Sequence, residues 1–171
     1  MRLLYEKYKI YVYIKKLKAY KLKFKNSFTL YYHKLYDNNW NLDSYIKIYT
    51  FNNIAQFFML YNCCTKLNNG MYFLMKNNIK PIYETKENIN GGYMSIKVSE
   101  KEVNKLWLYL SLDFVGNTLS NKNIVNGLSI SYKKKFYIIK IWIKNKKYKN
   151  ITNLNINSYN LNNILYNNFI N

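Results

Sequence analysis

The sequence predicts an α+β fold in which a curved antiparallel β-sheet carries helices on one face. Segments rich in β-branched and aromatic residues outnumber segments with helical spacing. The links between neighbouring strand segments are short, which favours antiparallel pairing. The chain has 171 residues, a length typical of one domain with its own hydrophobic core.

The predicted elements follow one another as two strands, a helix, two strands, a helix and two strands. Alternating or β-rich patterns predict the strands at 28–32, 45–49, 70–75, 93–98, 127–132 and 136–143. Apolar residues at helical spacing predict a helix over 52–63, with Asn52 or Asn53 as its N-cap. The same spacing predicts a helix over 100–115 that ends at Gly116.

Both ends of the chain give weaker patterns. Residues 1–26 form a basic N-terminal arm whose pattern fits a strand and a basic helix equally well. Residues 144–171 are rich in Asn and Lys, and they either hold one helix near 161–169 or are largely loose. We therefore predict one domain over residues 27–171, preceded by the basic arm.

The charge balance has two interpretations. The chain carries a net charge of +19, and 26 of its 27 basic residues are lysines. Asn, Lys, Tyr and Ile make up 94 of the 171 residues, and A/T-rich codons encode all four. The excess of lysine therefore fits codon bias in an AT-rich genome, such as that of a protist or a large DNA virus, as well as it fits an anionic partner.

Several classes of protein are disfavoured. His33 is the only histidine and Cys63 and Cys64 are adjacent, so we expect no metal site and no disulfide framework. The eight acidic residues show no acid/base spacing, and Gly91-Gly92 lacks the Lys-Ser/Thr of a phosphate loop. There is no apolar run of 18 residues and no signal-like apolar segment near the N-terminus. We expect neither an enzyme nor a cofactor, and no membrane partner.

Binding residues are better represented. Trp40 and Tyr83 lie in predicted loops, and Glu84 follows Tyr83 directly. A lysine run over 133–135 separates two predicted strands, and Trp142 lies near the end of the second strand. Loop aromatics stack on bases, lysines bind phosphates and a carboxylate accepts hydrogen bonds from a base edge. This combination indicates a protein that binds a nucleotide or an RNA end.

Four segments resemble one family, translation initiation factor 4E, the messenger-RNA cap-binding protein. The run Phe-Asn-Asn-Ile-Ala-Gln-Phe-Phe-Met-Leu-Tyr over 51–61 is similar to the signature of its first helix. Pro-Ile-Tyr-Glu over 81–84, with Gly91-Gly92 seven residues after the glutamate, is similar to its cap-binding loop. The spacing from Trp107 to Gly116 and the segment 127–142 match the next helix and strands, so the resemblance covers residues 28–143.

The resemblance implies a cap site in the concave face of the sheet and three long helices on the convex face. Trp40 and Tyr83 match the two cap-stacking positions, and Glu84 matches the residue that reads guanine. Lys133 and Lys135 match phosphate-binding positions, and Trp142 matches the tryptophan that touches the base methyl group. Three positions depart from the family, with Tyr83 for tryptophan, Tyr93 for arginine and Ile138 for lysine.

On the convex face, the resemblance implies that a factor 4G scaffold, or a competitor, docks an amphipathic helix. Ile54, Leu108 and Leu112 match the family there, whereas Phe58 replaces a tryptophan and Tyr109 replaces an acid. We expect a monomer that binds capped messenger RNA in the cytoplasm, or in the host cytoplasm if the source is viral. The alternatives are a cap-binding repressor that does not recruit the scaffold, and a general basic RNA-binding or ribosomal protein.

Overall fold

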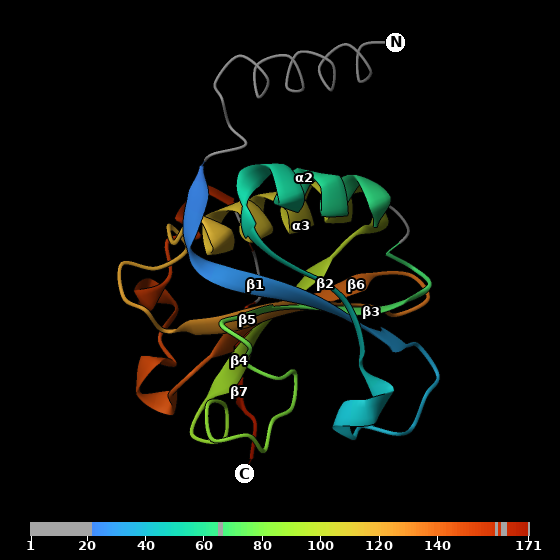
Figure 1. Cartoon of the computed structure of the whole chain (residues 1–171). Coiled ribbons are helices and arrows are strands. Elements are labelled where there is room, and N and C mark those ends of the chain that lie inside the picture. Colours follow the sequence, from blue (N-terminus) through green and yellow to red (C-terminus); the bar gives the residue numbers. More distant parts are fainter. Residues whose placement is uncertain (1–21, 65–66, 160, 162–163, 171) are drawn as a thin grey trace.

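One antiparallel sheet forms the framework of the domain (Figure 1). The computed structural model describes residues 22–64, 67–159, 161 and 164–170. Within them the strand order is β2-β1-β3-β5-β6-β4-β7. The strands are β1 (Lys23–Lys34), β2 (Ile46–Asn53), β3 (Gly70–Lys76), β4 (Gly92–Val98), β5 (Val125–Tyr132), β6 (Tyr137–Ile143) and β7 (Leu165–Asn168).

Two helices, α2 (Ile54–Cys63) and α3 (Glu100–Val115), cover one face of the sheet (Figure 1). The Asn53 side chain caps α2 by accepting a hydrogen bond of 2.9 Å from the Gln56 N–H, so one of the two predicted N-caps is confirmed. Gly116 ends α3 and donates its N–H to the Leu112 carbonyl at 2.8 Å. The predicted α+β class and the antiparallel pairing are confirmed.

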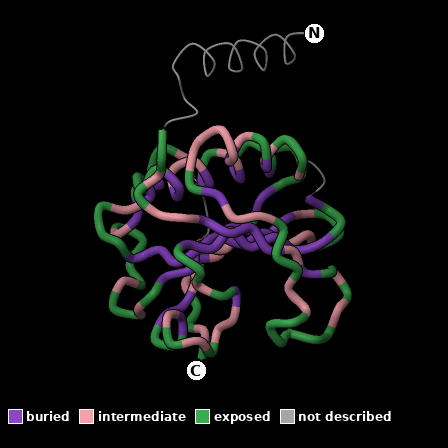
Figure 2. Tube along the Cα trace, viewed as in Figure 1, coloured by how far each residue is buried: buried purple, intermediate pink, exposed green. Residues whose placement is uncertain are grey.

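The sheet buries side chains on both faces, but unequally. Under the helices lies the main core, which includes Leu74, Leu128 and Ile139 and the buried side of α3. On the opposite face a smaller cluster is built from Tyr31, Met71, Phe73, Met75 and Trp142. Figure 2 shows the buried residues concentrated along the strands and on the inner sides of the helices. The second cluster forms the floor of the helix-free, concave face.

Two expectations for the ends of the chain need correction. β1 begins at Lys23, so residues 23–26 belong to the sheet and not to the arm, and residues 1–21 lie outside the described part. Phe24 supports this strand start by packing edge-on against Phe28, with ring centroids 5.8 Å apart. The helix considered near 161–169 is wrong, because residues 165–168 form β7 and pair with β4.

The third long helix implied by the family resemblance is also absent from the described residues. After β6 the chain forms three single-turn 3₁₀ segments, at Lys146–Tyr148, Ile151–Asn153 and Asn157–Tyr159. Asparagine side chains favour such turns by accepting hydrogen bonds from backbone N–H groups two residues later, as Asn145 and Asn150 do here. No helix in the described part of the chain is long and apolar enough to cross a membrane.

Candidate functional site

A cavity of about 540 Å³ opens on the concave face, between the loop that follows β1 and the loop that follows β3. Both loops extend from the side of the sheet opposite the helices (Figure 1). Four of the predicted binding residues line this cavity, namely Trp40, Tyr83, Glu84 and Lys133. These residues come from three separate loops, so the fold brings together side chains up to 93 positions apart.

Trp40 is held by a short, hydrogen-bonded loop. The side chains of Asp37 and Asn39 accept hydrogen bonds from the backbone N–H groups of residues 39 and 41, each at 2.9 Å. The buried His33 ring stacks under the indole, with centroids 4.4 Å apart and planes 4° apart. Its two ring nitrogens each lie 2.8 Å from a backbone carbonyl oxygen, those of Lys34 and Asn39. One face of Trp40 is therefore supported, while the side chain stays 52% exposed.

Tyr83 lies on a cluster of aromatic rings. Its ring stacks on Phe169 with centroids 4.7 Å apart and also contacts Trp142 at 5.0 Å. The Lys140 ammonium donates to the Tyr83 hydroxyl at 3.3 Å. Burial, followed by the nearby Tyr93 and Glu84, raises the pKa of Tyr83 to about 12. The phenol is thus neutral at physiological pH, and its ring is supported from below.

The Glu84 carboxylate is exposed at the edge of the cavity. Within the described residues it makes no hydrogen bond and no ion pair, although the neighbouring Glu87 lies 3.9 Å from the Lys86 ammonium. Burial raises the pKa of Tyr45, a residue of the cavity wall, and the nearby Glu84 adds to this effect. The carboxylate oxygens of Glu84 are therefore free to accept hydrogen bonds from a ligand.

A buried amide holds the loop that carries Tyr83 and Glu84. The Asn88 side chain is fully buried and donates to the carbonyls of Lys80 and Ile82, at 3.1 Å and 2.7 Å. Asn126 on β5 donates in turn to the Asn88 side-chain oxygen at 2.9 Å and to the Glu87 carbonyl at 2.7 Å. These bonds tie the loop to the sheet and fix the backbone just before Tyr83.

The Gly91-Gly92 pair allows the end of this loop to join the sheet. A Cβ on Gly91 would lie 2.0 Å from the Ile143 carbonyl oxygen, and one on Gly92 would lie 2.2 Å from the Asn167 carbonyl oxygen. β6 and β7 therefore approach the pair too closely for any larger residue. The glycines identified in the sequence place the loop; they do not contact the cavity.

The predicted lysines do not all reach the cavity. Lys133 lines it, whereas the exposed Lys135 does not. A cation that the sequence analysis did not single out, Lys140, also lines it and lies 3.9 Å from the centroid of the Tyr93 ring. Burial, with a smaller contribution from Lys133, lowers the pKa of Lys140. Among the described residues, the walls of the cavity thus carry two lysines and one carboxylate, Glu84.

Trp142 lies beneath the surface of the concave face. Its side chain has no exposed area, and its indole N–H donates to the Ser129 hydroxyl at 2.9 Å. Tyr83 and Phe169 pack over it at centroid distances of 5.0 Å and 4.8 Å. In this structure Trp142 lies beneath Tyr83 and Phe169 and has no exposed surface for a ligand to touch.

The residues predicted to bind a partner lie on the helical side. Ile54 and Phe58 of α2 and Leu108 and Leu112 of α3 are partly buried and pack against the main core, while Tyr109 is exposed. The Tyr61 hydroxyl joins the two helices by donating to the Asn104 carbonyl at 3.0 Å. The structure therefore brings both helices into one surface, away from Trp40 and Glu84.

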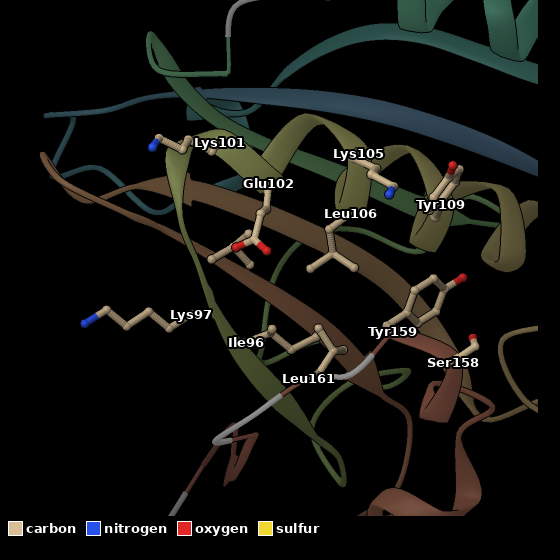
Figure 3. A pocket seen from close by; sticks show the side chains of 11 residues that line it. Ile96, Lys97, Lys101, Glu102, Lys105, Leu106, Tyr109, Ser158, Tyr159 and Leu161 are labelled. Atoms are coloured by element: carbon tan, nitrogen blue, oxygen red, sulfur yellow. The ribbon is translucent and has the colours of Figure 1, made fainter.

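A larger cavity of about 810 Å³ also lies on the helical side (Figure 3). Its walls are β4, α3 and the segment around Tyr159, and the side chains of Glu102, Leu106 and Tyr159 are among those drawn there. Tyr109 reaches this cavity too, so it is a wall residue as well as a member of the predicted partner surface. Its described lining shares no residue with the lining of the concave cavity, so the two are distinct sites.

Several residues that shape the site were not predicted from the sequence. The alternation over 137–143 places Lys140 on the same face of the strand as Trp142, so Lys140 could have been predicted to lie near the site. No local pattern predicts a place in the site for His33, Tyr45 and Phe169, because each makes its ring contacts with residues from other segments of the chain. The described residues contain no cluster of three or more His, Cys, Asp or Glu that could hold a metal.

Comparisons with known proteins agree with this architecture. Among solved structures, Caenorhabditis elegans eIF4E-3 in complex with the 4E-binding protein Mextli and cap analog is similar, with a TM-score of 0.68, 22% identity and coverage of 77% of this chain and 79% of that one. Ascaris suum eIF4E-3 with m7G cap is similar with a TM-score of 0.67, 19% identity and coverage of 77% and 78%. At these identities the structures show a shared fold.

Sequence comparisons give closer relationships. The Candida albicans eukaryotic translation initiation factor 4E is 31% identical over 130 residues, which cover 68% of this chain and 62% of the relative. The Lactuca sativa factor 4E-1 is 28% identical over 102 residues, covering 57% and 43%. The chain thus matches about half of the length of these curated relatives. The profile of the family described as eukaryotic initiation factor 4E matches residues 23–168, and the chain belongs to this family.

Proposed function

We propose that this chain is a non-enzymatic factor that binds the 7-methylguanosine cap of messenger RNA in the concave cavity and supports translation initiation. The observation that carries the proposal is the Glu84 carboxylate, which has no partner among the described residues and lies in a cavity that also contains an exposed tryptophan. Membership of the factor 4E family supports this function, as does the structural similarity to proteins whose complexes contain a cap or cap analog.

Stacking provides the first part of the recognition. A 7-methylguanine ring is positively charged, so it gains both stacking and cation–π attraction from an aromatic face. Trp40 offers its free face, because His33 covers the other one. Tyr83 provides the second ring from the opposite loop and is supported by Phe169. Each stacked ring contributes about 1–3 kcal/mol.

Glu84 provides selectivity for guanine. An ionised carboxylate can accept hydrogen bonds from both the N1–H and the exocyclic amine of guanine, a pair that adenine does not present. Each charge-assisted bond contributes about 1.5–3 kcal/mol. The Asn88 network supports this role because it fixes the backbone immediately before Tyr83 and Glu84.

Phosphates require cations beyond the stacked base. Lys133 and Lys140 line the cavity, whereas Lys135 lies outside it in the turn between β5 and β6. We therefore assign the first phosphate contacts to Lys133, with Lys135 available to phosphates further along the RNA. Trp142 acts indirectly in this arrangement, as the buried support of Tyr83.

The convex surface of α2 and α3 is the proposed docking site for an amphipathic helix of a scaffold protein or its competitor. The apolar side chains of Ile54, Phe58, Leu108 and Leu112 supply the contact area. The structural relative from C. elegans is in a complex with the 4E-binding protein Mextli, which supports a protein partner for this fold. Phe58 and Tyr109, which depart from the family pattern, favour the second candidate function of a cap-binding repressor. We propose that the factor acts as a monomer in the cytoplasm.

Calorimetric titration with 7-methylguanosine triphosphate and with unmethylated GTP tests cap binding. We expect the methylated ligand to bind more tightly, and Glu84→Gln to weaken its binding by about tenfold or more. Glu87→Gln is the matched control, because this carboxylate is in the same loop but does not line the cavity. Equal binding of both nucleotides, or equal effects of the two variants, would reject cap recognition and favour a general RNA-binding protein.

Titration with a Tyr-x-x-x-x-Leu-apolar peptide tests the convex surface separately. Binding that is lost in Leu108→Asp, with cap affinity intact, supports recruitment of a scaffold. If the peptide does not bind while the cap does, the repressor is the better assignment.

A further inference from the structure

A third cavity, of about 290 Å³, lies where the end of β3 meets the loop between α3 and β5. Its lining includes Lys25, Lys76 and Lys122, and none of the described lining residues is acidic. It shares no lining residue with the concave cavity. Met71 lies about 17 Å from Lys76 along β3 and pairs with Ser131, so the Lys133 turn lies beyond the other end of this strand.

Lys76 is the unusual residue of this cavity. Its side chain is only 5% exposed, and its ammonium makes one hydrogen bond, to the neutral side-chain oxygen of Asn123. Among the described residues the only ion pair joins Lys86 to Glu87, so no carboxylate compensates the buried charge. Buried lysines ordinarily pair with an acid, and an ammonium offers three donors. Besides this bond the ammonium lies 5.9 Å from the centroid of the Phe114 ring, and two of its N–H donors have no hydrogen-bond acceptor among the described residues.

The surroundings of Lys76 are also positive or hydrogen-bond donating. Lys144 adds to the effect of burial, and together they lower the pKa of Lys76 to about 8, so the group is still mostly protonated at pH 7. The side-chain oxygens of Asn117 and Asn121 already accept hydrogen bonds, from Asn26 and Asn155, and their N–H₂ groups donate to no residue that the structure describes. An anion would satisfy these donors and offset the repulsion between the lysines.

The end of α3 does not oppose an anion here. The carbonyl end of a helix carries partial negative charge, which would disfavour an anion if its oxygens were unpaired. In this structure the carbonyls of Leu112, Asp113 and Phe114 accept hydrogen bonds from the backbone N–H groups of residues 116–119. The helix end is thus closed by its own cap.

We propose that this cavity is a second anion site, which binds a phosphate group through the Lys76 ammonium with Lys25 and Lys122 at its rim. A cavity of about 290 Å³ has room for one phosphate group and part of its substituent. The group comes either from a small phosphate compound or from the backbone of an RNA. The site is independent of cap recognition, because it lies outside the concave cavity and uses none of its residues.

Titration of the ¹⁵N-labelled full chain with inorganic phosphate at constant ionic strength tests the proposal. We expect saturating shifts in the backbone amides of Lys76 and residues 119–125, distinct from any shifts at Lys133. Lys76→Met should weaken this binding by about tenfold or more. Lys47→Met, an exposed lysine of β2, is the matched control and should leave it unchanged. Non-saturating shifts spread over all surface lysines would overturn the proposal, as would unchanged binding in Lys76→Met.

Lys122→Ala keeps the test decisive if Lys76→Met does not fold. This side chain is exposed, so its loss should weaken phosphate binding and spare the fold; unchanged binding would again overturn the proposal. A short uncapped single-stranded RNA identifies the source of the phosphate. If it shifts the same amides, the ligand is an RNA backbone; if only inorganic phosphate does so, the ligand is a small phosphate compound.

Discussion

Asn88→Ala should uncouple the loop of Tyr83 and Glu84 from the sheet. The substitution removes two hydrogen bonds that Asn88 donates, to the Lys80 and Ile82 carbonyls, and one that it accepts from Asn126. Each bond has a net value of about 1 kcal/mol, and buried groups left without partners add to the loss. We therefore expect the free energy of unfolding to fall by about 2–4 kcal/mol.

The same variant should bind the cap analogue less tightly. A displaced loop no longer holds the stacking ring and the carboxylate in place, and losing one such contact costs about tenfold in Kd. Urea denaturation measures the stability and calorimetry measures the affinity, at a temperature where both proteins are folded. Asn90→Ala is the matched control, since the exposed Asn90 side chain makes no hydrogen bond among the described residues.

The two measurements separate a role of Asn88 in stability from a role in positioning the loop. If stability falls but affinity does not, Asn88 supports the fold without positioning the site. If neither changes, the buried hydrogen bonds of Asn88 contribute nothing measurable to stability or to cap binding, and the predicted role of Asn88 is wrong.

Three further predictions concern single residues. Phe169→Ala should weaken cap binding, because Tyr83 loses the ring that is stacked on it. Ile170→Ala, at the next and exposed position, is the control and should leave cap binding unchanged. Equal affinities of the two variants in calorimetry would contradict this role of Phe169. Lys76→Met should raise the free energy of unfolding at pH 7 in phosphate-free buffer. Folding lowers the pKa of Lys76 from 10.5 to about 8, so between pH 8 and pH 10.5 the unfolded chain binds more protons than the folded chain. The free energy of unfolding of the parent should therefore rise with pH over this range, and that of Lys76→Met should rise less. Lys134 has a φ of 59°, a backbone conformation that is unfavourable for residues with a Cβ. Lys134→Gly should therefore raise the free energy of unfolding by about 1 kcal/mol in urea denaturation. An unchanged free energy of unfolding would show that this backbone conformation does not destabilise the parent.

The sequence predicted the central elements well because their patterns are local. α3 follows from apolar residues at helical spacing and from the stop at Gly116, and each of the six predicted strands lies within or overlaps an observed one. β7 was missed because its short segment has no clear alternation, and its pairing with β4 joins residues about 70 positions apart. The third helix implied by the family resemblance does not form because residues 146–159 are rich in asparagine, which favours caps and turns.

The residues of the candidate site that could be predicted are aromatic or charged residues in predicted loops. Trp40, Tyr83, Glu84 and Lys133 all line one cavity, as the sequence analysis expected of binding residues. Their supports could not be predicted in the same way. Phe169 reaches the site only because β7 is the edge strand, and the contacts of the buried Asn88 require the folded loop.

The unequal burial of the three tryptophans has an optical consequence. Trp107 and Trp142 are 6% and 0% exposed, whereas Trp40 is 52% exposed. A quencher dissolved in water therefore reaches Trp40 and leaves the emission of the two buried indoles almost untouched. The unmodified protein thus contains its own fluorescent reporter at the mouth of the concave cavity, and a ligand stacked on Trp40 would shield it from that quencher. Iodide should be especially effective in the absence of ligand, because the net charge of +19 concentrates anions at the surface.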